Sequence, residues 1–196
     1  MGRVGRVERT TKETDIAIAI DLDGSGSTDV ATGIGFFDHM LTAFGRHGLF
    51  DLSVEVKGDL EVDGHHSVED TGIVLGRVFA QALADKRGIR RFGSIALPMD
   101  ETLVLAACDL SGRGQLHWDV PVPPVMLGSF DASLAKEFFI AFAANAGVTL
   151  HVRLFAGENA HHIVEACFKA VARALREAVE DDPRLGDDLP STKGAL

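Results

Sequence analysis

The 196-residue sequence has no long apolar run, only two cysteines and no excess of basic residues. A helix that spans a bilayer needs about 20 apolar residues, and no stretch of this length is present. The N-terminal stretch MGRVGRVERTTKET lacks the apolar core of a secretion signal and the Ser or Thr that a myristoylation motif requires. We therefore expect a cytosolic protein with no membrane partner.

Both cysteines, Cys108 and Cys167, lie in apolar stretches. Disulfides are rare in cytosolic proteins, and an unpaired cysteine in such a stretch behaves as a small apolar residue. The sequence therefore predicts two buried thiols rather than a disulfide.

Acidic residues outnumber basic ones by 29 to 19, which gives a net charge of −10. A nucleic acid as the main partner is excluded by this balance, because phosphate backbones bind basic surfaces. The acidic residues near 177–182 are interpreted as a solvated helix end. Apolar residues make up 46% of the chain, enough for one sizeable core or two small fused lobes.

Two stretches, 65–69 and 161–165, share the pattern His-His-x-x-Glu and lie 96 residues apart. On a helix, each Glu is a neighbour of both preceding His residues, at i+3 and i+4. The two adjacent His point about 100° apart, so each stretch should donate ligands to two different metal centres. Imidazole and carboxylate together suit Mn, Fe, Zn, Co or Ni. A single copy is equally explained as a polar helix start, where the helix dipole favours Glu. Two copies at matched positions favour metal ligands.

Hydrophobic periodicity predicts the same order of elements in both halves of the chain. In the first half, strands are expected at 3–11, 14–22, 28–32 and 51–57, and helices at 36–48 and 65–86. In the second half, strands are expected at 94–99, 103–110, 115–120 and 148–155, and helices at 130–147 and 161–180. A basic connector at 87–93 separates the halves, and an irregular tail begins at residue 183.

This order indicates an internal repeat of about 95 residues. Aligning 65–85 with 161–181 gives seven identities in 21 positions, and aligning the two earlier helices without gaps pairs His39 with Glu137, because the intervening loops differ by two residues. We predict an α+β fold of two duplicated lobes, each a four-stranded sheet packed with two helices. The expected half-repeats are residues 1–88 and 89–196, which together make one catalytic domain.

Several motifs, in this order along nearly the whole chain, are similar to those of one enzyme family. They are Phe37–Leu41, His47, Asp63–Asp70, Ser111–Arg113, Thr149–His151, His161–Glu165 and Pro190–Gly194. This combination resembles the imidazoleglycerol-phosphate dehydratases of histidine biosynthesis. The resemblance implies a manganese-dependent hydro-lyase without a fused phosphatase domain, and the left-handed split βαβ superfold also seen in GHMP kinases.

The resemblance implies two Mn²⁺ ions per active site, with ligands shared between subunits of trimers that build a 24-subunit shell. One ligand group would contain His39, His66, Glu69 and His162, and the other His65, Glu137, His161 and Glu165. At position 137 the family often has His. A carboxylate also suits Mn²⁺, which is a hard ion. The alternative is that Glu137 is a solvated helix residue and that its metal has one ligand fewer.

The substrate of the family carries an imidazole ring, a diol and a phosphate. The resemblance implies that Arg91, Arg113, Ser191 and Lys193 bind the phosphate, with Arg as a bidentate fork and Lys as a point charge. Glu13 matches an acidic residue of the substrate site. The remaining substrate-binding residues implied are His39, His47, His65, His66, Glu69, His161 and His162.

Dehydration removes a hydroxyl from the carbon beside the ring and a proton from the next carbon, which no carbonyl makes acidic. Metal coordination favours an imidazolate that expels the hydroxyl as a diazafulvene-like intermediate forms. Loss of the proton then gives an enol and, after ketonisation, imidazole-acetol phosphate. Glu13, Glu69 and Glu165 are the candidates for proton transfer, and which of them acts at each step stays open. His47 and His151 are further candidates for proton transfer or for supporting a ligand, although His151 on a strand is equally well explained as a buried core residue.

Two other functions fit the paired His-His-x-x-Glu pattern. A hydrolase that uses metal-bound hydroxide would need the same ligands, but it would not explain the basic residues of both connectors and the tail. A metal-storage assembly would use the ions only to join subunits, and the absence of turnover with an imidazole substrate would identify it.

Overall fold

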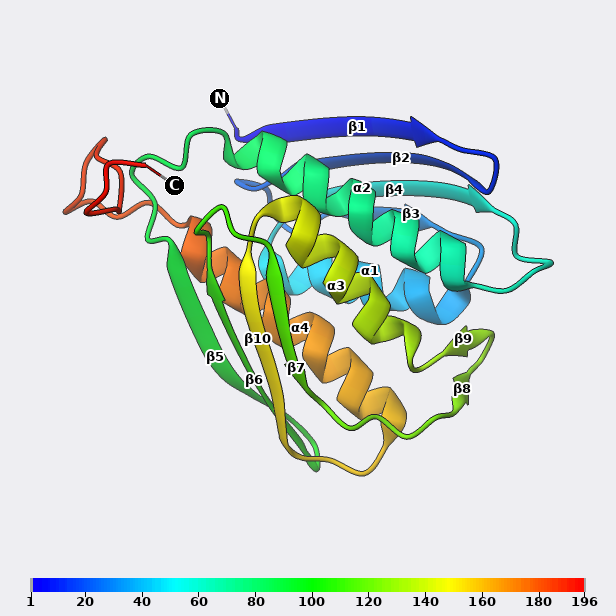
Figure 1. Cartoon of the computed structure of the whole chain (residues 1–196). Helices are drawn as coiled ribbons and strands as arrows, with labels where there is room; N and C mark the ends of the chain where they lie inside the picture. Colours follow the sequence, from blue (N-terminus) through cyan, green and yellow to red (C-terminus); the bar gives the residue numbers. More distant parts are fainter. Residues whose placement is uncertain (1, 196) are drawn as a thin grey trace.

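The computed structural model of the protein describes residues 2–195 and contains two four-stranded sheets with four helices between them (Figure 1). The first half contains β1 (Val4–Thr10), β2 (Thr14–Asp21), β3 (Thr28–Ala31), α1 (Gly35–Gly48), β4 (Asp51–Gly58) and α2 (His65–Leu83). The second half contains β5 (Phe92–Met99), β6 (Thr102–Asp109), β7 (Gln115–Asp119), β8 (Met126–Leu127), β9 (Phe130–Asp131), α3 (Leu134–Ala146), β10 (Thr149–Ala156) and α4 (Ala160–Val179).

The two sheets have the same topology, which confirms the predicted duplication. Their strand orders are β1-β2-β4-β3 and β5-β6-β10-β7. In each sheet the first three strands pair antiparallel, and the last strand pairs parallel to its neighbour. The fold is therefore α+β, with two similar sheets that cover the helices from opposite sides.

The strands form because their side chains alternate between a buried and an open face. In β2, Ile16, Ile18 and Ile20 point inward and are each 1% exposed, while the residues between them face outward. This spacing of two matches the pleat of a strand that is covered on one side only. β4 and β6 follow the same rule, so each sheet presents one apolar face to the helices.

The helices pair across the two halves rather than within them. α2 runs beside α3, and α1 runs beside α4. Two glycines permit the close contact between α2 and α3. A Cβ on Gly72 would lie 2.6 Å from the carbonyl oxygen of Phe138, and a Cβ on Gly76 would lie 2.7 Å from the carbonyl oxygen of Phe142. The apolar residues of both halves consequently form one continuous core.

The predicted helix at 130–147 is wrong at its beginning. Phe130 and Asp131 form β9, which pairs with β8, and α3 begins only at Leu134. Gly128, at a φ of +64°, turns the chain between these two strands. Phe130 is fully buried and stacks on Phe37 with 5.8 Å between ring centroids, so packing outweighs helix propensity here. Among the described residues, no helix has the length and apolar character that a membrane span needs.

Candidate metal centre and phosphate site

Both His-His-x-x-Glu stretches begin a helix, as the sequence predicted, and a side chain two residues upstream fixes each beginning. The carboxylate of Asp63 accepts the backbone N–H of His65 at 2.7 Å, and the side-chain oxygen of Asn159 accepts that of His161 at 2.9 Å. Such side chains satisfy backbone donors that have no partner within the first turn. The two stretches therefore occupy equivalent positions in the duplicated fold.

Three of the predicted ligands converge where α1 meets α4. One carboxylate oxygen, Oε2 of Glu165, lies 3.3 Å from Nε2 of His39 and 3.0 Å from Nε2 of His161. All three ligand atoms lie within 4.8 Å of one another. Glu165 is buried, whereas both imidazoles are about half exposed, so the cluster opens to solvent on the side of the rings.

Lys169, one turn after Glu165, holds the other carboxylate oxygen. Its Nζ lies 2.6 Å from Oε1 of Glu165. Burial alone would raise the pKa of Glu165, but the hydrogen bond and the charge of Lys169 outweigh burial and lower it. Sequence reasoning missed Lys169, although its i, i+4 spacing from Glu165 was a usable signal.

The equivalent stretch on α2 is less complete within one chain. Nε2 of His65 lies 3.6 Å from Oε2 of Glu69, and both side chains are nearly half exposed. Within residues 2–195, the only group of three or more close metal-ligand atoms is the one at His39, so Glu137 does not join His65 and Glu69 at that distance.

The structure also groups His39 differently from the expectation. His39 lies with His161 and Glu165, not with Glu69, because α1 packs against α4. The two expected ligand groups therefore do not describe the contacts within a single chain.

The adjacent histidines diverge, as their helical positions predicted. The rings of His65 and His66 are perpendicular, with centroids 6.3 Å apart, and those of His161 and His162 meet at 82° with centroids 6.0 Å apart. Each pair therefore cannot point at one ion, which supports the interpretation that the second His serves a different centre from the first.

The second His of each pair binds a carboxylate through Nδ1. Nδ1 of His66 lies 3.0 Å from Asp59, and Nδ1 of His162 lies 2.8 Å from Glu101. The hydrogen bond from Asp59 raises the pKa of His66, and the one from Glu101 raises the pKa of His162. The hydrogen bond from His162, with backbone N–H groups, lowers the pKa of Glu101 to about 2. Neither carboxylate was among the predicted site residues: Asp59 lies in a loop seven residues before His66, and Glu101 lies in a turn 61 residues before His162.

The donor set of the first cluster fits a divalent transition metal. Two imidazole Nε2 atoms already converge on one carboxylate oxygen, which is a geometry that a metal ion between the three atoms would share. Lys169 binds only the opposite oxygen, so Oε2 contacts the two imidazoles and not the ammonium group. Glu165 would thus offer Oε2, and His39 and His161 their Nε2 atoms, as ligands.

The expected phosphate-binding residues gather at the carboxyl end of α4. Arg91 donates to Asp109 at 2.7 Å and to the carbonyl oxygen of Pro190, also at 2.7 Å, which places it beside the tail. Arg113 lies 3.8 Å from the same Asp109. Ser191 and Lys193 follow Pro190, and the Ser191 hydroxyl accepts the backbone N–H of Lys193.

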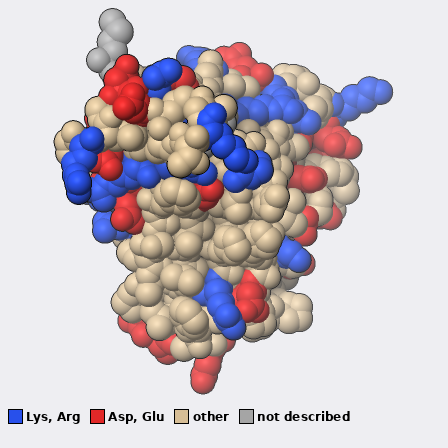
Figure 2. Space-filling view, turned by 60° about the vertical axis from the view of Figure 1, so that its left-hand side comes forward, with Lys and Arg blue, Asp and Glu red and all other residues tan. Residues whose placement is uncertain are grey.

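Lys and Arg side chains gather in the upper part of the face that carries this tail, and mostly uncharged surface lies below them (Figure 2). The tail, predicted only as irregular, is therefore held against the connector between the halves. The guanidinium groups of Arg91 and Arg113 lie beside this tail, with Asp109 between them as their common carboxylate.

The metal cluster and the phosphate residues lie at opposite ends of α4. The backbone N–H of Arg91 bonds the carbonyl of Ala178, near the end of the helix, whereas His161 is its second residue. The 17 residues between His161 and Ala178 correspond to roughly 25 Å at the rise of an α-helix. Figure 1 shows the same separation: the tail lies at one end of the molecule and the beginnings of α2 and α4 at the other.

His47 and His151 differ in their surroundings. His47, near the end of α1, is half-buried, and burial together with Lys169 and Arg173 lowers its pKa. It therefore faces the same helix as the metal cluster. His151 is exposed on the outer face of the second sheet and stacks on His117, with 4.2 Å between ring centroids. The buried-core interpretation of His151 is wrong, because its side chain lies on the outward face of β10.

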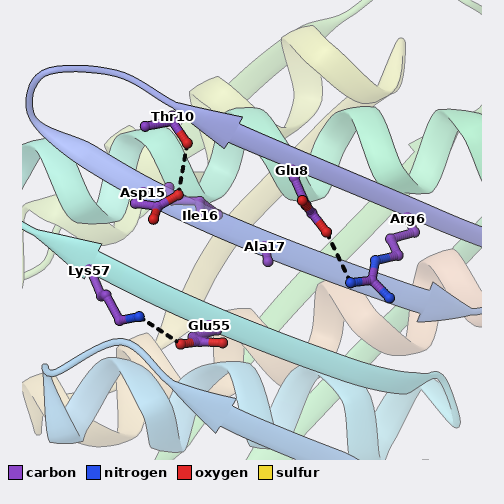
Figure 3. Close-up of a pocket in the computed structure, with 8 residues that line it drawn as sticks. All are labelled: Arg6, Glu8, Thr10, Asp15, Ile16, Ala17, Glu55 and Lys57. Atoms are coloured by element: carbon purple, nitrogen blue, oxygen red, sulfur yellow. Dashed lines mark hydrogen bonds and ion pairs between the residues drawn. The ribbon is translucent and has the colours of Figure 1, made fainter.

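A hollow of about 280 Å³ on the outer face of the first sheet is not part of this site (Figure 3). Arg6 pairs with Glu8 at 2.9 Å, and Lys57 pairs with Glu55 at 3.1 Å. These side chains lie on the outer face of the sheet, away from the helices that carry the histidines.

Comparison with known proteins identifies one family of similar chains. The model of the imidazoleglycerol-phosphate dehydratase family matches residues 32–175. The imidazoleglycerol-phosphate dehydratases of Granulibacter bethesdensis and Acidiphilium cryptum are each 60% identical over 196 residues, which is the full length of both chains in each case.

Solved structures are similar as well. The imidazoleglycerol-phosphate dehydratase of Staphylococcus aureus superposes with a TM-score of 0.83 at 38% identity, over 91% of this chain and 99% of that one. The enzyme of Pyrococcus furiosus, in complex with (S)-C348, also gives 0.83, at 39% identity, over 97% and 100%. With its duplicated sheets, its paired His-His-x-x-Glu helices and its Pro-Ser-Thr-Lys-Gly tail, the chain belongs to the imidazoleglycerol-phosphate dehydratase family of hydro-lyases.

Proposed function

We propose that this protein dehydrates imidazoleglycerol phosphate to imidazole-acetol phosphate in histidine biosynthesis, and that it requires two Mn²⁺ ions per active site. The observation that carries the proposal is the convergence of His39, His161 and Glu165 in a chain of this family. The enzyme would act in the cytoplasm, and residues 1–88 and 89–196 would be the two half-repeats of its single domain.

Different residues of the chain would bind the metal ions, bind the phosphate and transfer protons. Bound metal ions would stabilise the negative charge that develops on the imidazole ring. Arg91, Arg113 and Lys193 would hold the phosphate dianion, and the Ser191 hydroxyl would donate to one of its oxygens. The reaction breaks one C–O bond and one C–H bond and releases water, so one group must take the carbon-bound proton and one must protonate the leaving hydroxyl.

Glu13 is the carboxylate best suited to proton transfer. Its side chain is 54% exposed, and its nearest basic atom is Nε2 of His66 at 3.9 Å. Glu165, in contrast, has both oxygens engaged by Lys169 and by the two imidazoles. Glu69 contacts only His65 and is the alternative base, although ligation of a metal would engage it too.

We further propose that each active site contains residues of more than one subunit, within the 24-subunit shell expected for the family. The separation of roughly 25 Å along α4 supports this sharing. A three-carbon chain joins the ring of the substrate to its phosphate, and with bonds of about 1.5 Å it spans far less than that distance. One chain cannot bind both ends of one substrate molecule with these residues, so a neighbour must supply one of the two clusters.

Mixing two inactive variants tests function and sharing together. His39→Asn removes a metal ligand, and Arg113→Ala removes a phosphate contact from an exposed position. Each variant alone, loaded with Mn²⁺, should turn over imidazoleglycerol phosphate at least 100-fold more slowly than the wild type. After metal removal, 1:1 mixing and reassembly with Mn²⁺, about a quarter of the wild-type activity should return if two chains contribute to a site, because a quarter of the sites receive both intact clusters.

Light scattering of the mixture, and of wild-type chains mixed in the same way, controls for assembly. Mixed particles of the wild-type size without recovered activity would contradict shared sites. Wild-type protein that binds Mn²⁺ and assembles but forms no imidazole-acetol phosphate would contradict the dehydratase function itself and favour a storage assembly.

A further inference from the structure

In both metal-binding helices, a carboxylate contacts Nδ1 of the second His. This carboxylate comes from a different element in each half. Asp59 follows β4, and Glu101 lies in the turn between β5 and β6. They bind Nδ1 of His66 and of His162, at 3.0 Å and 2.8 Å. In both cases Nε2, on the opposite side of the ring, has a carboxylate no closer than 3.9 Å.

The chemistry of these contacts places a hydrogen on Nδ1 of both rings. An ionised carboxylate can only accept hydrogen bonds, so the ring nitrogen that it contacts must carry the hydrogen. A neutral imidazole with its hydrogen on Nδ1 presents the lone pair of Nε2. That lone pair is what a metal ion requires, and a hydrogen-bonded carboxylate also makes the ring a stronger ligand.

The carboxylates are themselves held in place. Oε1 of Glu101 accepts the backbone N–H of Asn159 at 3.1 Å, just before the first turn of α4. The backbone N–H of Asp59 donates to the carbonyl oxygen of Glu13 at 3.1 Å, so the turn that carries Glu13 and the ring of His66 share one anchor. Asp59 is only 20% exposed, which limits its freedom to turn away from the ring.

The two halves thus reach the same arrangement by different routes. Thr14 and Thr102 begin the equivalent strands β2 and β6, so Glu13 and Glu101 occupy equivalent turn positions. Glu101 holds His162 directly, whereas in the first half Asp59 holds His66, and the Glu13 carboxylate has no hydrogen-bond partner among residues 2–195. The same turn position therefore orients a ligand in one half and remains available for the substrate in the other.

We propose that Asp59 and Glu101 are positioning residues that fix His66 and His162 with Nδ1 protonated and Nε2 directed to a metal ion. The inference rests on the proposed metal-dependent function. It assigns both residues to the metal centres although neither touches the metal or the substrate. It also separates their role from that of Glu13, which would act on the substrate.

Mn²⁺ affinity tests this assignment independently of turnover. Free Mn²⁺ is measured by electron paramagnetic resonance during titration of the metal-free protein. Asp59→Ala and Glu101→Ala should each lower the affinity of the protein for one of the two expected Mn²⁺ ions by about 10- to 100-fold. Asp59→Asn and Glu101→Gln should retain most of the affinity, because an amide oxygen still accepts the Nδ1 hydrogen.

Matched controls remove the same charge from the same segments without touching a ring. Glu61→Ala lies two residues from Asp59, and Glu158→Ala lies beside the backbone that Glu101 binds; both positions are exposed. Both controls should bind Mn²⁺ as the wild type does. Glu13→Gln should also leave Mn²⁺ affinity unchanged while it lowers kcat about 100-fold or more.

Each outcome is decisive. Alanine variants that bind Mn²⁺ as tightly as the wild type would overturn the positioning role and leave the dehydratase function intact. Amide variants as weak as the alanine variants would also overturn it, because charge rather than ring orientation would then matter. Wild-type protein that binds no Mn²⁺ would overturn both this inference and the metal-dependent function on which it rests.

Discussion

Replacing Asp70 should show how the Glu13 turn is fixed to the helix that carries His65 and His66. The carboxylate of Asp70 lies 2.6 Å from Nη1 of Arg9 on β1 and accepts the Thr14 hydroxyl of β2 at 2.5 Å. Asp70 is 8% exposed, and the Arg9 side chain is 26% exposed. Removing one partner of such a pair leaves the other charge buried without compensation.

The magnitude follows from the burial of both partners. Breaking a buried ion pair costs about 3–5 kcal/mol, and the partial exposure of Arg9 places Asp70→Ala near 3 kcal/mol. For a chain of this length that corresponds to a melting temperature lower by roughly 6–12 °C. The measurement is urea denaturation of the metal-free protein, followed by circular dichroism at one fixed protein concentration.

The second half supplies the control variant. Arg9 of β1 lies opposite Ile16 of β2, and at the equivalent place in the second sheet Leu97 of β5 lies opposite Val104 of β6. The residue of α4 that is equivalent to Asp70 of α2 is Ala166. The double variant Arg9→Leu with Asp70→Ala therefore copies an apolar solution that the fold already uses. It should recover at least half of the loss, because no unpaired charge stays buried. A single variant that loses less than about 1 kcal/mol, or a double variant less stable than the single one, would refute the reasoning.

Three further predictions concern packing, thiols and acid. Gly93→Ala should destabilise the protein by about 3 kcal/mol in a thermal unfolding experiment, since the new Cβ would lie 2.0 Å from the carbonyl oxygen of Ala174. Gly35→Ala is the control and should be nearly neutral, because a Cβ there would have no atom within 4 Å. Cys108 and Cys167 should not react with Ellman's reagent until urea unfolds the chain, because burial raises the pKa of both thiols, that of Cys108 to about 12. Fast reaction of the folded protein would contradict their burial. The Arg3 hydrogen bond lowers the pKa of Asp23, so this pair stabilises the fold above the ordinary pKa of Asp and is lost as the pH falls through the lowered value. Asp23→Asn should therefore remove at most about 1 kcal/mol at pH 7 and less at pH 2, and an equal loss at both would contradict the ion pair.

Local patterns in the sequence predicted most of the fold. The alternation in β2 and the His-His-x-x-Glu helix beginnings depend on residues within a few positions of one another, so the sequence displays them directly. The same holds for the divergence of His65 and His66, which follows from helical geometry alone. Phe130 shows the limit, because its place in β9 depends on packing against Phe37, 93 positions earlier.

The site was predictable in its residue types but not in its contacts. His39 meets Glu165 only because α1 lies beside α4, and no sequence pattern states which helices become neighbours. Asp59 and Glu101 come from loops whose composition resembles any other acidic turn. Their importance emerges only from the 3.0 Å and 2.8 Å contacts that tertiary structure creates.

The crosswise pairing of the helices has a consequence for the origin of the chain. α1 and α3 are equivalent, as are α2 and α4, so the contacts of α2 with α3 and of α1 with α4 are the same contact repeated about an approximate two-fold axis. That is an isologous interface, the kind that joins two copies of one short polypeptide. A half-length ancestor would have carried the counterparts of His39 and of Glu165 on helices that meet only between two copies. Metal binding would then have required association before the two copies were ever joined into one gene.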